Sequence, residues 1–316
     1  MKRILILFLS IILAVSLLAG CNNVVQSPST TPSITPSTAP FESQVIEPSP
    51  TQDIPSETPI EPTAEPSPTV IPPNSTYIEY YDMYVDLTKT KELSRDIIYW
   101  AEKSPSLDAL NRQGAITTMY TTEDMEKEIY LSFNLGYEHV RGNTEKLLDI
   151  LKQRNIKATF FLVGEFIKDF PGKVQAIFDD GHTLGAHSYF HTPPSYTMTD
   201  EEYIEDFIKT EQLLEIALAD KYVRMHFYRP ISGEFCERDL YIAKALGYQT
   251  VLFDATYGDW NRTIINGSEF AYNELKKDVH KGAIYQLHIV TPDNIEALPK
   301  FLDELIVDGW TFKVFE

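Results

Sequence analysis

The sequence contains little cysteine and few basic residues for its length. Among its 316 residues, Cys21 and Cys236 are the two cysteines, which excludes a disulfide scaffold and a multi-cysteine zinc module. Lys and Arg number 27 against 46 Asp and Glu, which gives a net charge of −19. Nucleic acid is therefore not expected as a partner, because binding phosphate requires a basic surface. A hydrophobic fraction of 43%, with 12% aromatic residues, is nevertheless enough for one large core.

Glycine motifs that bind phosphate are also missing. No Gly-x-Gly-x-x-Gly follows the first predicted strand, and no Gly-x-x-x-x-Gly-Lys occurs in the chain. Both motifs hold nucleotide phosphates with backbone N–H groups at the start of a helix. A nucleotide-binding open sheet is therefore disfavoured.

The first 21 residues have the features of a lipoprotein signal peptide. Lys2 and Arg3 precede an apolar run over residues 4–18, which is shorter than the roughly 20 residues that a spanning helix needs. The run ends in Leu-Ala-Gly-Cys at 18–21, which resembles a bacterial lipobox, with an ordinary secretory signal as the alternative. We therefore expect export and a lipid anchor on Cys21, at the outer face of the bacterial cytoplasmic membrane and facing the cell wall. Cys236 then has no intrachain partner, so no disulfide is expected.

Residues 22–76 are expected to form a disordered linker that is rich in Pro, Ser and Thr. Residues 26–76 hold 13 of the 20 prolines, with six acidic residues and no Lys or Arg. Such a segment has too little apolar surface to offset the entropy of ordering. Residues 77–125 are rich in tyrosine and charge, and we interpret them as an extension packed on the domain that follows.

From about residue 126 to residue 316, strand-like and helix-like segments alternate. Strands are predicted near residues 129–133, 157–163, 183–187, 225–228, 249–253, 283–287 and 311–315, with helices between them. Asn143 is predicted to cap the first of these helices. Seven strands alternating with helices indicate an α/β fold with a parallel sheet. Because the nucleotide motifs are missing, the expected architecture is a distorted (β/α)7-type barrel.

Polar residues occur where the predicted strands end. They are Asn134, His187, His191, Arg229, Asp259, Trp260 and His288. In a β/α barrel the loops after the carboxyl ends of the strands carry the chemistry. One histidine at such a position is more often structural than functional, but several at matching ends of successive strands favour a site.

These residues resemble the motifs of polysaccharide deacetylases of the NodB-homology type, carbohydrate esterase family 4, over roughly the last 190 residues. The segments are Ser-Phe-Asn-Leu-Gly-Tyr-Glu at 132–138, where the family has Thr-Phe-Asp-Asp-Gly, His-Ser-Tyr-Phe-His at 187–191, Arg-Pro-Ile-Ser-Gly at 229–233, Asp-Trp at 259–260 and Leu-His at 287–288. The Gly-Tyr-Glu at 136–138 is similar to the branch that deacetylates muramic acid residues. The resemblance implies a distorted barrel, hydrolysis of an N-acetyl amide, and peptidoglycan or a related N-acetylglucosamine or muramic-acid glycan as partner.

At one point the sequence departs from this family. The resemblance implies that His187, His191 and the residue at 135 hold a divalent metal such as zinc, and that the residue at 134 is the general base. Here Asn134 and Leu135 replace the two aspartates. A carboxamide is not basic near neutral pH, and a leucine binds no metal. Two histidines alone hold a metal weakly or not at all, since a catalytic zinc site usually has three protein ligands.

The other implied roles keep their residues. His288 matches the acid that protonates the departing amine, and Arg229 and Asp259 match the groups that orient the site. Tyr189 and Trp260 are candidates for binding sugar, with a packing role as the alternative.

Three functions stay open from the sequence. The first is a degenerate relative that binds glycan without cleaving it. The second is a deacetylase with a rearranged site, in which Glu138 is a substitute base or His139 joins the two histidines. The alternative for Glu138 and His139 is an exposed position in a loop. The third function is that of a structural or partner-binding protein anchored to the wall.

Overall fold

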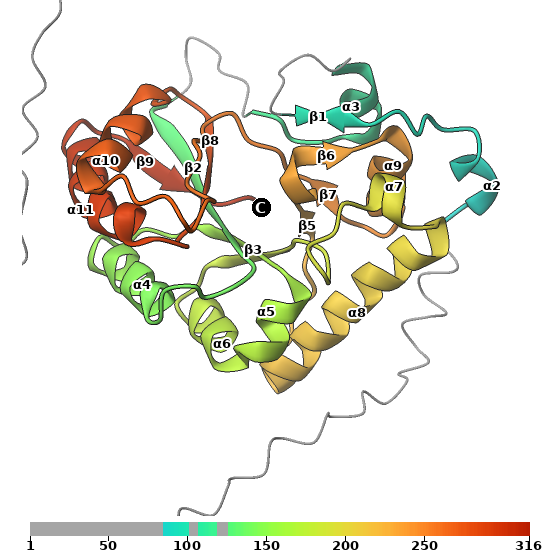
Figure 1. Ribbon diagram of the computed structural model, residues 1–316, viewed down its shortest axis with the longest axis horizontal. Coiled ribbons are helices and arrows are strands. Elements are labelled where there is room, and N and C mark those ends of the chain that lie inside the picture. Colours follow the sequence, from blue (N-terminus) through green and yellow to red (C-terminus); the bar gives the residue numbers. More distant parts are fainter. Residues whose placement is uncertain (1–84, 101–106, 119–125) are drawn as a thin grey trace, which may run out of the picture. The chain divides into compact units, whose positions relative to one another are not determined.

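The computed structural model describes residues 85–100, 107–118 and 126–316 (Figure 1). The predicted signal peptide with Cys21 and the predicted linker over residues 22–76 lie outside the described residues. No helix in the described part of the chain is both long and apolar enough to cross a membrane.

Seven parallel strands form the central sheet, as predicted. They are β2 (Glu128–Leu135), β3 (Thr159–Leu162), β4 (Thr183–Ala186), β5 (Phe227–Tyr228), β7 (Gln249–Thr250), β8 (Ala283–Leu287) and β9 (Thr311–Lys313). The order is β7-β5-β4-β3-β2-β8, and β9 pairs with the first half of β2 while β3 pairs with the second half. A bridge between Ala255 and Tyr285 joins the chain after β7 to β8, so the curled sheet closes into the expected distorted barrel.

Alternation along the strands divides the side chains between two cores. On β2, Leu131 and Phe133 belong to the large core beneath the helices, whereas Tyr130 belongs to a cluster inside the barrel. That inner cluster consists of Tyr130, Phe161, Phe227, Val251, Phe253, Ile284 and Phe315. Because successive residues of a strand point to opposite faces, Ser132 and Asn134 share the inner face with Tyr130.

Helices follow the strands and cover the outer face of the sheet (Figure 1). They are α4 (Asn143–Gln153), α5 (Gly164–Asp169), α6 (Pro171–Asp179), α7 (Pro194–Thr197), α8 (Asp200–Leu218), α9 (Glu237–Ala245), α10 (Ser268–Lys277) and α11 (Pro292–Val307). The longest, α8, begins with a capping box in which Thr199 and Glu202 each accept a hydrogen bond from the other's backbone N–H.

The predicted cap at Asn143 is wrong. The helix α4 begins at Asn143, and its N-cap is Gly142. The Asn143 amide instead donates to the carbonyls of Ile289 and Thr291, at 2.8 and 3.1 Å. The Glu138 carboxylate accepts hydrogen bonds from the backbone N–H groups of Gly142 and Thr144, so a residue four positions earlier supplies the cap.

Segments before residue 126 contact this domain. They include α2 (Leu87–Thr90), β1 (Ile98–Tyr99) and α3 (Leu107–Gln113), and β1 pairs antiparallel with β6 (Glu234–Phe235). Ile116 exchanges backbone hydrogen bonds with Thr250 and Leu252, at 2.8 and 2.7 Å, beside β7. These bonds cover a sheet edge that would otherwise expose unpaired backbone groups.

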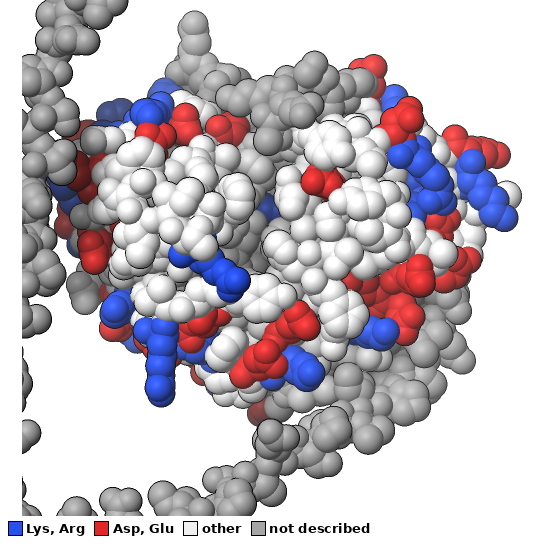
Figure 2. Space-filling model, in the orientation of Figure 1, with Lys and Arg blue, Asp and Glu red and all other residues white. Residues whose placement is uncertain are grey.

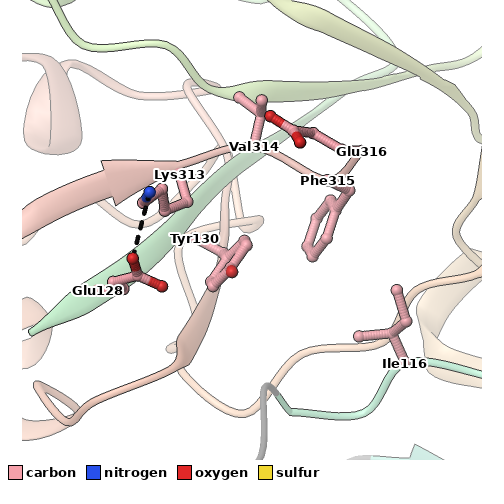
Figure 3. Close-up of a pocket in the computed structure, with 7 residues that line it drawn as sticks. All are labelled: Ile116, Glu128, Tyr130, Lys313, Val314, Phe315 and Glu316. Atoms are coloured by element: carbon pink, nitrogen blue, oxygen red, sulfur yellow. Dashed lines mark ion pairs between the residues drawn. The ribbon is translucent and has the colours of Figure 1, made fainter. Parts of the chain in front are cut away.

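The end of the barrel at the start of the strands is filled by the C-terminal residues. Phe315 stacks on Tyr130, with ring centroids 5.2 Å apart. Figure 3 shows the small cavity of about 250 Å³ beside this pair, with the ion pair between Glu128 and Lys313, 3.2 Å, at its wall. This end contains none of the motif residues.

Candidate functional site

A cavity of about 470 Å³ lies at the opposite end of the barrel, where the strands end. It is lined by Asn134, Gly136, Tyr137, His139, His187, His191, Ser232, Phe253, Thr256, Tyr257, Trp260, Gln286, His288 and Val290. Among these described residues there is no Asp, Glu, Lys or Arg. On the face of the molecule that Figure 2 shows, charged side chains gather mainly toward the edge, and the centre is hollowed and largely uncharged.

One side of the cavity carries a supported histidine. Asp259 Oδ1 lies 2.8 Å from His288 Nδ1, and Asp259 Oδ2 accepts from the His288 backbone N–H at 2.7 Å. Asn294 donates its amide to Asp259 Oδ2 at 2.7 Å and to the His288 carbonyl at 2.8 Å. Because Asp259 accepts a hydrogen bond from the Nδ1–H group, the Nε2 atom of His288 is left for a ligand in the cavity. Asn294 was not predicted from the sequence, since it lies in a helix without any motif.

Two further histidines lie on the loop after β4. His187 is buried, and its Nδ1 lies 2.7 Å from the carbonyl oxygen of Arg229, which fixes the proton on Nδ1 and leaves a lone pair on Nε2. The His187 and His191 rings are 5.3 Å apart. Burial lowers the pKa of both imidazoles, and the neighbouring histidines lower it further. The structure therefore brings the two predicted histidines together as neutral imidazoles.

A buried carboxyl holds this histidine loop. Asp206 Oδ2 accepts from the Ser188 hydroxyl at 3.1 Å and from the Tyr189 N–H at 2.9 Å. Ser188 and His191 both have φ near +60°, a left-handed conformation that costs energy in residues other than glycine. Burial raises the pKa of Asp206 to about 6. Tyr189, a predicted sugar-binding residue, is half-buried against Gly164 and is not among the residues that line the cavity.

Arg229 lies fully buried behind the cavity floor, and no described carboxylate pairs with it. Its guanidinium donates to the Ser132 hydroxyl at 2.8 Å and to the Asn134 side-chain oxygen at 3.1 Å. It also donates to the carbonyls of Val251 and Leu252, at 3.2 and 3.3 Å. Desolvation lowers the pKa of this guanidinium. Four polar oxygens thus replace a carboxylate partner for this cation.

The contact with Arg229 fixes the orientation of Asn134. Only the oxygen of a carboxamide accepts a hydrogen bond, and a guanidinium only donates, so Asn134 Oδ1 must face Arg229. The Asn134 nitrogen is then the atom that faces the cavity, where it donates to none of the described residues. Position 134 therefore presents a hydrogen-bond donor, with no basic atom, at the place where the family resemblance implies a general base.

Leu135 points away from this floor. It is buried in the large core beneath the helices and does not line the cavity. No group of three His, Cys, Asp or Glu side chains close enough to hold a metal is found among the described residues. The donor set at the histidine loop is two imidazoles without a third ligand, which does not fit a resident catalytic metal.

Glu138 and His139, the predicted substitutes, have different surroundings. The Glu138 carboxylate lies 2.7 Å from the Lys173 ammonium and caps α4, so its oxygens are occupied outside the cavity. His139 lines the cavity, and its Nδ1 lies 3.3 Å from the guanidinium of Arg262. Burial, and then the charge of Arg262, lower the pKa of His139.

One lining residue that was not predicted, Gln286, could have been found by counting along its strand. Gln286 belongs to β8 and lies two residues before His288, which directly follows the strand. Because alternate residues of a strand point to the same face, both lie on the inner face. The Gln286 Oε1 atom is buried and accepts from none of the described residues. Trp260, predicted to bind sugar, does line the cavity and is 65% exposed. A sugar in the cavity could stack on the exposed indole.

A model of the polysaccharide deacetylase family matches residues 121–251. The peptidoglycan-N-acetylmuramic acid deacetylase PdaA of Bacillus subtilis (strain 168) is 38% identical over 194 residues, which are 61% of this chain and 72% of that protein. The solved structure of Bacillus subtilis PdaA, described as a family 4 carbohydrate esterase, superposes with a TM-score of 0.64 at 33% identity. The match covers 70% of this chain and 96% of the PdaA chain.

A relative described as a pseudoenzyme is also similar. The wild-type form of this carbohydrate esterase family 4 protein from Bacillus anthracis has a TM-score of 0.53 at 27% identity, covering 59% of this chain and 63% of its own. A mutant of the same protein, with a TM-score of 0.53 and 27% identity, is described as having restored enzymatic activity; it covers 59% of this chain and 65% of its own.

Proposed function

Because the chain belongs to the polysaccharide deacetylase family, we propose that it binds an N-acetylated glycan of the peptidoglycan class in the cavity at the strand ends, without hydrolysing the acetamide. The ligand class rests on the similarity to PdaA, whose name specifies peptidoglycan N-acetylmuramic acid. The absence of hydrolysis rests on one observation, the donor amide that Asn134 presents to the cavity.

Amide hydrolysis needs two proton transfers. A base must take a proton from the attacking water, and an acid must protonate the departing amine. The structure retains a group for the second step, since His288 has its Nδ1 held by Asp259 and its Nε2 free for the cavity. Position 134 offers no acceptor for the proton of the attacking water, because the Asn134 oxygen is hydrogen-bonded to Arg229 and a carboxamide nitrogen is not basic.

A metal does not supply the missing function in this proposal. His187 and His191 provide two imidazoles, whereas Leu135 is directed into the core. The side chains that remain are suited to binding a sugar: His187 offers a lone pair, Asn134 offers N–H groups and Trp260 offers an exposed ring for stacking.

A deacetylase with a rearranged site is the second candidate. The intact hydrogen bonds among Asp259, His288 and Asn294 favour it, because they hold an acid in place. His139, on the cavity wall, would then be the group recruited as base or third ligand. Glu138 is a poorer candidate, since its carboxylate is bound to Lys173 and to the start of α4.

The cell surface is the proposed location. PdaA is named for an activity on peptidoglycan, which lies outside the cytoplasmic membrane, and the same location suits an exported chain. A lipid anchor on Cys21 and a linker over residues 22–76 would let the domain, together with its extension over 77–125, reach the wall.

Acetate release by the intact chain tests the proposal. N-acetylated peptidoglycan and chitooligosaccharides are incubated with the chain, with and without added zinc or cobalt, and binding to the same glycans is measured in parallel. The proposal expects saturable binding and no acetate. Acetate release that is lost in His288→Ala would overturn it in favour of the rearranged deacetylase. Absence of any glycan binding would overturn it as well.

A double variant, Asn134→Asp with Leu135→Asp, tests whether the two missing carboxylates are what prevents hydrolysis of the acetamide. A mutant of the Bacillus anthracis pseudoenzyme, which has a similar fold, is described as having restored enzymatic activity. Because an unpaired carboxylate is costly to bury, the new side chain at position 135 is expected to turn out of the core toward the histidine loop. With zinc, this variant is then expected to release acetate, and adding His288→Ala should abolish the release. Since Leu135 lies in the core, thermal unfolding of the variant is measured first, and Asn134→Asp alone serves as the milder change.

A further inference from the structure

Next to the cavity, three side chains from separate elements form an exposed polar and aromatic cluster. Tyr99 of β1 and Tyr196 of α7 are 44% and 60% exposed. Glu234 of β6 pairs in register with Tyr99, and its Oε2 accepts from the Tyr196 hydroxyl at 3.3 Å. In Figure 1 these elements, β1, β6 and α7, are near one another on the same side of the domain. We call Tyr99, Tyr196 and Glu234 the tyrosine cluster.

The tyrosine cluster is continuous with the cavity along the chain. Ser232 lines the cavity, and Glu234 follows it after a tight turn in which Ser232 and Gly233 have φ of 56° and 67°. Tyr196 lies five residues after His191, which also lines the cavity. Two residues of the tyrosine cluster therefore lie within five residues, along the chain, of residues that line the cavity.

The supports of the cluster are rigid. The Ser195 hydroxyl donates to Asp239, which fixes α7 beside its neighbour Tyr196. Trp100 follows Tyr99, and its indole N–H donates to the carbonyl of Phe253, a residue of the cavity wall. Binding of a ligand at the cluster thus requires little additional ordering of the protein.

We infer that the tyrosine cluster is a second sugar-binding subsite, which takes a neighbouring sugar unit of the same glycan chain whose N-acetylated unit occupies the cavity. This inference rests on the proposed function. Exposed tyrosine rings stack on the apolar faces of sugars, and a carboxylate accepts hydrogen bonds from neighbouring hydroxyls. The Glu234 Oε1 atom accepts from none of the described residues and is available for a ligand. No Lys or Arg belongs to the cluster, so it suits hydroxyl groups and not an anion.

Part of the subsite comes from the segment before the residues that match the family model. Tyr99 belongs to the segment before residue 121 and thus lies outside the part that matches the family model. The paired strands β1 and β6 place Tyr99 beside Glu234. The segment before the family domain would thereby contribute directly to glycan binding.

Binding of chitooligosaccharides of two lengths to the intact chain tests the inference. The parent is expected to bind the pentasaccharide about tenfold more tightly than the disaccharide, because the longer ligand reaches the cluster. In Tyr99→Ala with Tyr196→Ala this gain should disappear, while affinity for the disaccharide stays unchanged. Tyr196→Phe should keep most of the gain, because it retains the ring. Val307→Ala, at an 85% exposed position in α11, is the matched surface control.

The outcomes separate the two proposals. If the parent binds neither ligand, the proposed function fails. If the parent shows the gain and the double tyrosine variant retains it, the subsite is wrong although the proposed function stands. An equal loss of affinity for both lengths in the variant would also overturn the subsite. Thermal unfolding of the variants shows whether such a loss comes from misfolding.

Discussion

The two sides of the cavity differ in what supports their polar side chains. On the side with the histidines, buried carboxylates accept hydrogen bonds. Asp259 accepts three from described groups around His288. Asp206 accepts two from the loop that carries His187 and His191. At the end of β2 no carboxylate is present, and the buried guanidinium of Arg229 is bound by neutral oxygens. A buried carboxylate that satisfies several donors is costly to remove, whereas an amide of the same shape fits the wall at position 134. The supported side carries the groups that the family resemblance implies, whereas position 134 does not.

The largest expected effect comes from removing the carboxylate on the supported side. Asp259→Ala leaves the His288 N–H and the Asn294 amide without their acceptor, and is expected to lower the free energy of unfolding by about 4 kcal/mol. Urea denaturation of the intact chain measures the change. Asp259→Asn, which keeps one oxygen acceptor, should lose less. If Asp259→Ala is as stable as the parent, the two sides do not differ in the way described.

The second effect depends on pH and concerns the histidine loop. Burial raises the pKa of Asp206 to about 6, above the value of about 3.9 in an unfolded chain. The group therefore stabilises the fold fully below about pH 4, and this contribution, up to about 3 kcal/mol, is lost as the pH rises through 6. Asp206→Asn should remove this dependence, as measured by urea denaturation at pH 4.5 and 7.5.

A neighbouring residue provides the control for that experiment. Glu205 precedes Asp206 on α8, and its side chain is 58% exposed. Glu205→Gln should leave the difference between the two pH values as it is in the parent. An Asp206→Asn variant with the same pH dependence as the parent would contradict the assignment.

The third effect tests the unsupported side directly. Asn134→Ala removes one acceptor from the buried Arg229 and should cost about 1–2 kcal/mol in the free energy of unfolding. Asn134→Asp should be at least as stable as the parent at pH 7, because it places a carboxylate next to the guanidinium. Equal destabilisation by the two substitutions would show that Arg229 does not require an oxygen at position 134.

The smallest effect concerns Glu138. In Glu138→Gln the ion pair with Lys173 is lost while one oxygen still caps α4, so a loss of about 0.5–1 kcal/mol is expected. Glycan binding should be unchanged, because Glu138 does not line the cavity. Acetate release by the parent that disappears in Glu138→Gln would instead identify Glu138 as a base.

The parts of the fold that could be predicted are those with long periodic patterns. The apolar runs of β2, β3 and β8 are long enough to identify strands, and seven strands were found as expected. The pair β1–β6 could not be foreseen, since each strand has two residues and its partner is more than 100 residues away. The cap of α4 was missed for a similar reason: Asn143 is a common capping residue, but only the folded chain shows that Glu138 reaches the helix start.

The candidate site was predictable where residue type carries the chemistry. Rules for strand ends and spacing selected His187, His191, Arg229, Asp259 and His288, and the structure brings them together around one cavity floor. Tyr189 also stands in a motif, yet its ring lies against Gly164 and does not line the cavity. Asn294 has no sequence signal of its own, whereas Gln286 could have been found from its spacing of two residues to His288.

The sequence by itself determined that the two aspartates are missing and that His288, the two loop histidines and Arg229 are present, because these are matters of residue type at fixed spacing. The tertiary structure alone decided what the replacements do. It directs the Asn134 oxygen to Arg229 and thus its nitrogen to the cavity, and it buries Leu135 in the core. The physical reason is that the orientation of an amide depends on its hydrogen-bond partner, here an arginine 95 residues away, and no local pattern encodes that contact.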